Sequence, residues 1–254
     1  MKTSGNTILI TGGGSGIGEA LAHRWHDAGN SVIVSGRRRE ALEQAVAGRP
    51  HMHAMALDVE DPAAIDTFAR RVLAEHPRLN VLVNNAGIMR FEALDRVRDL
   101  ADAEATIATN LLGPIRLTNA LIDHLAAQPD AAIVNLTSGL AFVPMIDTPT
   151  YCATKAAIHS YTVSLREALR GRVEVIELVP PAVQTGLTPG QATRPGYQPL
   201  QDFADEAFAL LTAQPTPPEV LVERVRWLRF AEAEHRFDET VTQLNDFARK
   251  ARQG

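Results

Sequence analysis

The sequence contains a single cysteine, Cys152, and this scarcity excludes several kinds of site. One cysteine can form neither an internal disulfide nor a thiolate metal cluster. The eight histidines match no H-E-x-x-H spacing, so we predict no metal site. No apolar run approaches the roughly 20 residues that span a bilayer, and the N-terminal apolar run is too short for a signal peptide. We therefore expect a cytoplasmic protein without a membrane partner.

Positive charge is also scarce. The net charge of −5 and the pI of about 5.9 argue against a surface for nucleic acid or anionic membranes. Lysine occurs only at Lys2, Lys155 and Lys250, whereas the other 22 of the 25 basic residues are arginine. This chain uses arginine wherever charge alone is needed. A lysine at position 155 therefore indicates a chemical role for its compact ammonium group.

Tyr151 lies four residues before Lys155, after a serine and an apolar loop over residues 139–150. On a helix this spacing places the phenol and the ammonium on one face. A nearby cation favours the phenolate, so we predict a lowered pKa for Tyr151 and proton exchange with a carbonyl or alcohol oxygen. The alternative is a packed tyrosine beside a solvated lysine.

Strand and helix patterns alternate along the chain. Apolar, β-branched runs predict strands at 6–11, 31–35, 51–57, 79–83, 131–137, 172–179 and 219–223. Helical patterns include 62–76, 99–127 and 151–170. The alternation predicts an α/β fold, a Rossmann-like doubly wound parallel sheet of about seven strands with helices on both faces. We expect one domain over residues 1–254, with a substrate-loop region near 186–215 and a charged helical tail near 224–250.

A glycine-rich turn joins the first strand to a helical pattern that Gly29 ends. Such a turn lets the backbone approach a pyrophosphate, which then lies on the helix N-terminus. The alternative is a flexible glycine loop. The predicted dinucleotide contacts from this turn are Gly12, Gly14, Ser15, Gly16, Ile17 and Gly18.

Three arginines follow the second strand, directly after Gly36. A fold that prefers NAD shows Asp or Glu near this place, for the ribose 2′-hydroxyl. Arginines in a helix's first turn oppose the macrodipole by roughly 0.3–1 kcal/mol each, which a dianionic phosphate would offset. We therefore favour NADP(H) over NAD(H), with Arg37 the first and Arg38 the second choice as 2′-phosphate ligand. A solvated basic face is the alternative.

Further polar residues stand where other strands end. Asp58 follows the third strand, where it could bind an adenine amino group or cap the next helix. Asn110 interrupts a helical stretch just before Gly113-Pro114, which predicts a bend. Ser138 follows the fifth strand. Because ligands of open α/β sheets lie outside the carboxyl ends of the strands, these segments converge on one edge.

Together these residues resemble the classical short-chain dehydrogenase/reductase family over roughly residues 5–185. The resemblance rests on Thr11-Gly12-x-x-x-Gly16-x-Gly18, Asp58, Asn84-Asn85-Ala86-Gly87, Asn110, Ser138, Tyr151-x-x-x-Lys155 and Pro180-x-x-Val183-x-Thr185. It implies a Rossmann fold, a nicotinamide cofactor, and hydride transfer between that cofactor and a carbonyl or alcohol. It also implies a homodimer or homotetramer, with contacts through helices 99–127 and 151–170.

The resemblance implies a role for each matched residue. Tyr151 is the proton donor or acceptor, and Lys155 binds the nicotinamide ribose and lowers the pKa of Tyr151. Ser138 orients the carbonyl, Asn110 holds a water that links Lys155 to solvent, and Thr185 contacts the carboxamide. The remaining implied cofactor contacts are Asp58, Val59, Asn85, Ala86, Gly87, Pro181 and Val183.

The chain departs from the family pattern in two places. Pro180-Pro181 replaces the usual Pro-Gly after the sixth strand, which removes glycine's backbone freedom there. The family's glycine-rich ending around the seventh strand is also missing.

Two loops, 139–150 and 186–203, face the predicted site, and the second is expected to be a mobile lid. Their apolar residues favour a hydrophobic or aromatic substrate, although they could instead pack on a partner subunit. The predicted substrate contacts are Leu140, Phe142, Val143 and Leu187. Arg90 and Arg194 could bind an acidic substrate or be plain surface.

The sequence therefore predicts an NADP(H)-dependent oxidoreductase that reduces a ketone or aldehyde, or oxidises a secondary alcohol. One alternative is a dinucleotide-binding redox sensor without turnover. Another is an epimerase or dehydratase on the same scaffold.

Overall fold

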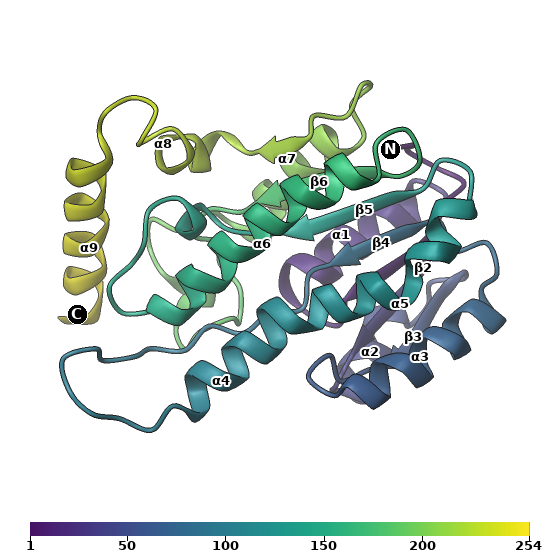
Figure 1. Cartoon of the computed structure of the whole chain (residues 1–254), viewed down its shortest axis with the longest axis horizontal. Coiled ribbons are helices and arrows are strands. Elements are labelled where there is room, and N and C mark those ends of the chain that lie inside the picture. Colours follow the sequence, from purple (N-terminus) through teal and green to yellow (C-terminus); the bar gives the residue numbers. More distant parts are fainter. Residues whose placement is uncertain (254) are drawn as a thin grey trace.

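One parallel sheet organises the computed structural model, which describes the backbone of residues 1–253 and the side chains of residues 1–250 (Figure 1). Within these residues seven strands follow the order β3-β2-β1-β4-β5-β6-β7. The strands are β1 (Thr7–Thr11), β2 (Ser31–Gly36), β3 (Met52–Ala56), β4 (Val81–Asn84), β5 (Ala132–Leu136), β6 (Glu174–Val179) and β7 (Glu219–Leu221). The Rossmann-like fold class is confirmed, and every predicted strand is present.

Both faces of the central strands β1, β4 and β5 are buried, which explains why these strands are mostly apolar. Ile8 and Ile10 of β1 point into one hydrophobic cluster, whereas Leu9 points into the other, as the two-residue period of a strand requires. Side chains from α1 (Gly16–Asp27), α2 (Arg39–Val46) and α7 (Leu200–Leu211) belong to the first cluster. Side chains from α3 (Pro62–Glu75), α5 (Gly113–Ala127) and α6 (Pro149–Ala168) belong to the second.

The predicted helix over 99–127 is interrupted where the sequence indicated a bend. It consists of α4 (Ala101–Ile107), a π-helical segment (Ala108–Leu112) and α5. Asn110 lies in the π-helical segment. Such segments are frequent at functional sites because they re-aim side chains.

One prediction for the C-terminal third needs correction. Residues 186–215 are not all loop, because α7 lies within them and buries Phe203 completely in the core. The tail is helical as predicted and consists of two separate helices, α8 (Arg226–Arg229) and α9 (Phe237–Gln253). Figure 1 shows α9 as an upright helix beyond the edge of the sheet.

The strand order changes direction between β1 and β4. From β1 the chain continues to β2 toward one edge of the sheet, and from β4 it continues to β5 toward the opposite edge. In open α/β folds ligands bind at the carboxyl ends of the strands next to such a switch point.

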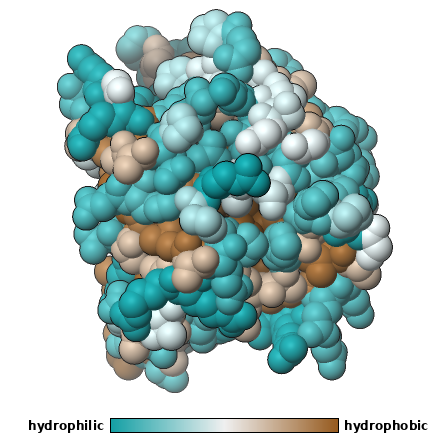
Figure 2. All heavy atoms as spheres, turned by 90° about the vertical axis from the view of Figure 1, so that its right-hand side faces the viewer, coloured by the Kyte–Doolittle hydropathy of each residue, from teal (hydrophilic) through white to brown (hydrophobic). Residues whose placement is uncertain are grey.

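Figure 2 shows the surface of the molecule from the side that lies on the right in Figure 1. Hydrophilic side chains cover most of this surface. Within residues 1–253, no helix combines the length and apolarity needed to cross a bilayer.

Candidate active site

Two cavities lie at the carboxyl edge of the sheet. The larger has a volume of about 570 Å³ and is lined by Ser138 and Tyr151. The smaller has a volume of about 200 Å³ and is lined by the glycine turn after β1. We call them the catalytic cavity and the dinucleotide cavity.

Ser138 and Tyr151 come together from two elements. Ser138 follows β5 and caps a short 3₁₀ helix (Gly139–Ala141), where its Oγ accepts a 3.1 Å hydrogen bond from the Leu140 amide. Tyr151 lies in the first turn of α6, where Pro149 fits because a first-turn amide needs no helical partner. The Ser138 hydroxyl lies near enough to the Tyr151 phenol to favour its phenolate form. Ser138 can thus contact the same substrate oxygen as Tyr151.

Lys155 lies one helical turn after Tyr151, as its spacing predicts. Its side chain is buried, and Nζ donates a 2.8 Å hydrogen bond to the Leu136 carbonyl. Nζ lies 5.6 Å from the centre of the Tyr151 ring. Burial disfavours the ammonium and lowers the pKa of Lys155 to about 8.

The prediction of a lowered pKa for Tyr151 is wrong, because the surrounding protein raises this pKa. Burial disfavours the phenolate and raises the pKa of Tyr151 to about 12, although the hydrogen bond with Ser138 opposes part of this rise. The phenol is therefore protonated at neutral pH. A protonated phenol is suited to donating a proton.

Asn110 connects the loop after β4 to helix α6. Its Oδ1 accepts a 2.9 Å hydrogen bond from the Ile88 amide, and its Nδ2 donates a 2.8 Å bond to the Ile88 carbonyl. Nδ2 also lies 3.4 Å from the hydroxyl of Thr154, the neighbour of Lys155. The residue is buried, and the structure places it against Thr154, the residue before Lys155.

Glu92 supports the start of α6, and sequence reasoning missed it. Its carboxylate accepts hydrogen bonds from the Thr150 amide (3.2 Å) and the Thr150 hydroxyl (2.7 Å), and it pairs with Arg98. The side chain is buried, so the carboxylate is a fixed anion at the helix N-terminus. Glu92 thereby holds the backbone next to Tyr151.

The dinucleotide cavity gathers most of the predicted cofactor residues. Its lining includes Gly12, Gly14, Ser15, Arg37, Arg38, Asp58, Val59, Ala86 and Gly87. A Cβ atom on Gly14 would lie 3.2 Å from the Ala41 and Leu42 backbone, and Gly12 has a φ of +66°. The turn therefore needs glycine at both positions, and it leaves a cradle at the N-terminus of α1. This cradle suits a pyrophosphate, so the residues present fit a dinucleotide.

The two arginines of this cavity differ in their partners. Arg37 Nη1 lies 3.2 Å from a carboxylate oxygen of Glu60, so Arg37 is already in an ion pair. Arg38 Nη2 donates a 3.2 Å hydrogen bond to Ser15 Oγ, a neutral group. The positive charge of Arg38 thus lies against the glycine turn without a carboxylate partner among the residues that the structure describes.

The two interpretations of Asp58 can now be separated. Asp61, not Asp58, caps α3, because its side chain accepts a 2.8 Å hydrogen bond from the Ala63 amide. Asp58 accepts from the Glu60 amide at 3.0 Å and lines the dinucleotide cavity. Its helix-capping alternative is therefore wrong.

Several predicted cofactor residues lie behind the glycine turn instead of lining the cavity. Asn85 Nδ2 donates a 2.8 Å hydrogen bond to the Thr11 carbonyl, and a Cβ on Gly18 would lie 2.4 Å from that nitrogen. Val183 has its side chain in the core. Asn85 and Gly18 thus pack against each other at the turn. None of the three residues lines the dinucleotide cavity, and their role as cofactor contacts stays a prediction.

The remaining predicted cofactor contacts have different surroundings. Pro181 lines the catalytic cavity. The side chain of Thr185 faces Gly16, since a Cβ there would lie 3.5 Å from it. Ile17 packs partly on the core. Gly16 has a φ of +57°, so this position also favours glycine.

Two of the four predicted substrate contacts need correction. Leu140 and Leu187 line the catalytic cavity, but Phe142 and Val143 do not. Val143 is completely buried against Leu228. Phe142 stacks edge-on against His159, with 4.9 Å between the ring centres. The apolar run 139–146 thus divides between the cavity and the protein core.

The C-terminal helices supply a wall of the catalytic cavity that sequence reasoning missed. Trp227 of α8 and Leu244 and Phe247 of α9 line it. Asn245 fastens α9, because its Oδ1 accepts a 2.7 Å hydrogen bond from the Ile146 amide. The spacing of Val241, Leu244 and Ala248 marks one helical face, a signal that could have indicated a packed helix.

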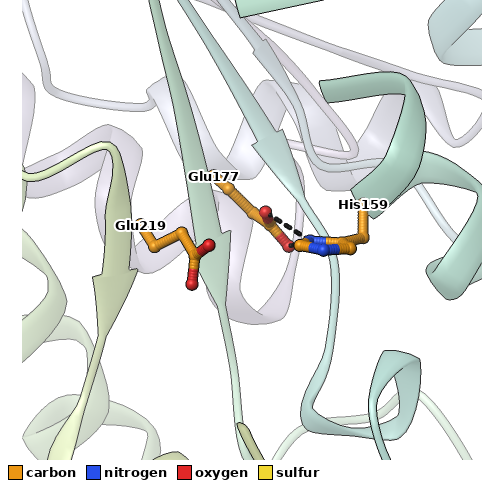
Figure 3. Close-up of side chains that lie close together, drawn as sticks. All are labelled: His159, Glu177 and Glu219. Atoms are coloured by element: carbon orange, nitrogen blue, oxygen red, sulfur yellow. Dashed lines mark hydrogen bonds and ion pairs between the residues drawn. The ribbon is translucent and has the colours of Figure 1, made fainter. Parts of the chain in front are cut away.

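A polar cluster of His159, Glu177 and Glu219 surrounds the buried Glu177 (Figure 3). Glu177 of β6 accepts hydrogen bonds from His159 Nδ1 (2.8 Å) and Thr137 Oγ1 (2.7 Å), while Glu219 of β7 pairs with Arg229 (2.7 Å). His159, Glu177 and Glu219 place their ligand atoms within 4.8 Å of one another, as a metal site would. Arg229 and Thr137 already bind the two carboxylates, so we interpret the cluster as support for the end of β5.

Comparison with known proteins agrees with this geometry. The sequence matches the short chain dehydrogenase family over residues 6–195. It is 40% identical to the uncharacterized oxidoreductase DltE of Bacillus subtilis (strain 168), over 96% of this chain and 100% of that protein. It is 32% identical to a sulfoacetaldehyde reductase of Chromohalobacter salexigens, over 88% of this chain and 96% of that protein.

The fold has solved counterparts. A short chain dehydrogenase from Burkholderia cenocepacia J2315, solved in complex with NADP, superimposes with a TM-score of 0.83 at 24% identity, over 96% of this chain and 99% of that one. At this identity the likeness concerns the fold alone. The family match, which spans most of the chain, carries the assignment. The chain belongs to the short-chain dehydrogenase/reductase family, whose members are oxidoreductases.

Proposed function

We propose that the protein is an NADPH-dependent reductase of aldehydes or ketones. The observation that carries the proposal is that the Ser138 and Tyr151 side chains together line a cavity of about 570 Å³. Burial raises the pKa of Tyr151 to about 12, so the phenol is protonated at neutral pH and can donate the proton that carbonyl reduction needs. The Chromohalobacter salexigens relative is likewise named as a reductase of an aldehyde.

The proposed mechanism assigns one task to each polar side chain. A bound reduced nicotinamide would supply the hydride for the carbonyl carbon. The Ser138 hydroxyl holds the carbonyl oxygen, and the Tyr151 phenol gives its proton to the alkoxide that forms. General acid catalysis of this kind contributes about 10²–10⁴-fold. The Lys155 ammonium stabilises the phenolate that remains, and Asn110 provides the link toward solvent for reprotonation.

The proposed preference for NADPH rests on Arg38 more than on Arg37. Arg37 shares its charge with Glu60, whereas Arg38 lies on Ser15 of the glycine turn. An unpaired guanidinium gains more from a dianionic phosphate than one already in an ion pair. We therefore reverse the order that the sequence suggested and make Arg38 the first 2′-phosphate ligand.

We also propose a homo-oligomer. Ile107, Leu112 and Val163 are large apolar residues at least 36% exposed on the α4–α5 and α6 segments. These are the helices for which the family resemblance implies subunit contacts. Light scattering coupled to size exclusion should give at least twice the 27.5 kDa chain mass, and a monomer would refute the proposal.

The test of the activity follows NADPH absorbance with a panel of aldehydes and ketones. Wild-type protein should consume NADPH with at least one aldehyde, and the Tyr151→Phe variant should lose turnover by about 10²-fold or more. The variant should bind NADPH with wild-type affinity, because the phenol oxygen is lost but the ring remains. Wild-type turnover in the variant would refute the role of Tyr151.

The same assay separates the two alternatives. A redox sensor would bind NADPH without consuming it under any condition. An epimerase or dehydratase would convert its substrate without a net absorbance change. A redox sensor without turnover does not explain why Ser138 and Tyr151 line a substrate-sized cavity.

A further inference from the structure

We propose that Arg194 and Arg224 form an oxyanion-binding subsite in the catalytic cavity. On this proposal, which rests on the proposed function, the substrate is a carbonyl compound with an apolar body and a carboxylate or sulfonate group. The subsite would set specificity and would not take part in proton transfer.

Both guanidinium groups contact the same turn of the chain, at residues 196–197. Arg194 stacks on the Tyr197 ring at 5.4 Å from its centre and lies 3.4 Å from its hydroxyl. Arg224 Nη1 donates a 3.2 Å hydrogen bond to the Gly196 carbonyl. Residues separated by 30 positions in the sequence thus bring two positive charges to residues 196–197. Both arginines line the catalytic cavity.

The charges of this turn are not balanced within the cavity. Among the described residues that line it, these arginines are the only charged side chains, since no Asp, Glu or Lys is present. Neighbouring arginines do have acidic partners: Arg226 pairs with Glu223, and Arg229 pairs with Glu219. Among the side chains of residues 1–250, neither Arg194 nor Arg224 forms such an ion pair. Guanidinium groups with unused donors are suited to binding a carboxylate or sulfonate.

The surroundings of the two arginines favour a substrate with an apolar body. Phe247 of α9 covers the turn, because a Cβ on Gly196 would lie 3.6 Å from its ring. Leu140, Leu187 and Leu244 line the same cavity as Ser138 and Tyr151. A volume of about 570 Å³ is also larger than a two-carbon aldehyde fills. We therefore expect a longer carbonyl acid.

The test compares two aldehydes, 4-formylbenzoate and its methyl ester, which differ by the negative charge and one methyl group. Wild-type protein should show a kcat/KM at least about tenfold higher for the acid, because each guanidinium contributes a charge-assisted hydrogen bond. The acid-to-ester ratio should fall about tenfold in Arg194→Gln and in Arg224→Gln. Arg226→Gln is the matched control, since Arg226 does not line the cavity, and it should keep the wild-type ratio. An equal kcat/KM for acid and ester in wild-type protein, or a ratio that neither substitution changes, would overturn the proposal.

A binding measurement separates this proposal from the proposed reductase activity. Calorimetry with 4-formylbenzoate on Tyr151→Phe protein needs no turnover. Weaker binding after Arg194→Gln or Arg224→Gln would support the subsite even if wild-type protein reduced neither aldehyde, in which case only the proposed activity would fail. Equal binding in both arginine variants would refute the subsite even in an active enzyme.

Discussion

The Lys155 ammonium donates a 2.8 Å hydrogen bond to the Leu136 carbonyl, two residues before Ser138. The bond joins the end of β5 to the first turns of α6, the two elements that carry Ser138 and Tyr151. The lysine is buried, and this burial opposes its charge. The buried ammonium thus links the two elements at a cost in stability.

Replacing Lys155 by Met should raise the stability of the cofactor-free protein at pH 7 and abolish turnover. The pKa of Lys155 is about 8 in the folded state, below the roughly 10.4 of an unfolded lysine. The unfolded state therefore binds more protons between these pH values, and the wild type gains stability as pH rises through this window. Below pH 8 the full burial cost remains, so the variant should melt higher by about 2–4 °C per kcal/mol removed.

Thermal unfolding at pH 7 and pH 10 checks this prediction. The difference between variant and wild type should shrink at the higher pH, since the wild-type lysine is then neutral. A variant that melts lower than wild type at pH 7 would show that the bond to Leu136 outweighs the burial.

His159 should stabilise the fold in acid more than in base. Its hydrogen bond with Glu177 raises its pKa, and the Glu219 charge adds to the rise, whereas burial and Arg229 oppose it. A folded pKa above the unfolded value gives stability that is complete below about pH 6.5 and is lost as pH rises through the folded pKa. His159→Gln should thus lose roughly 1.5–3 kcal/mol of unfolding free energy at pH 5.5 and less at pH 9.

Urea unfolding of wild type and variant at the two pH values measures this difference. An equal loss at pH 5.5 and pH 9 would mean that packing of the ring against Phe142, and not charge, is what His159 contributes.

The sequence was sufficient for the sheet and for the residues at its carboxyl edge, because both follow local patterns. Apolar runs marked the strands, and the four-residue spacing placed Lys155 one turn after Tyr151. What could not be predicted depends on contacts distant in sequence. Asn245 fastens α9 to Ile146 across 99 residues, and that contact makes α9 a wall of the catalytic cavity. The depth of burial, which reverses the pKa shift of Tyr151, is likewise a property of the whole fold.

Glu92 is expected to act as a positioning residue for Tyr151. Glu92→Ala removes the acceptor for the Thr150 amide and hydroxyl, so the first turn of α6 loses its fixed anion. We expect kcat to fall about tenfold, with the KM for NADPH unchanged, because a misplaced general acid affects the chemical step. Glu92→Gln keeps one acceptor oxygen and should recover part of the rate.

Steady-state kinetics of both variants test the role of Glu92. Asp95→Ala is the matched control on the same loop, because Asp95 is 82% exposed and should tolerate substitution. A parallel rise in the KM for NADPH would indicate a general structural effect and count against positioning.

Cofactor preference should respond to Arg38 more than to Arg37. Both side chains line the dinucleotide cavity, but Arg37 is held by Glu60 and Arg38 lies on Ser15 at the glycine turn. Arg38→Gln should raise the KM for NADPH about tenfold and change that for NADH little, since only NADPH carries the 2′-phosphate. Arg37→Gln should have a smaller effect, because Glu60 already neutralises that charge. Kinetics of both variants with both cofactors measure the ranking, and a larger effect at Arg37 would restore the order that the sequence alone suggested.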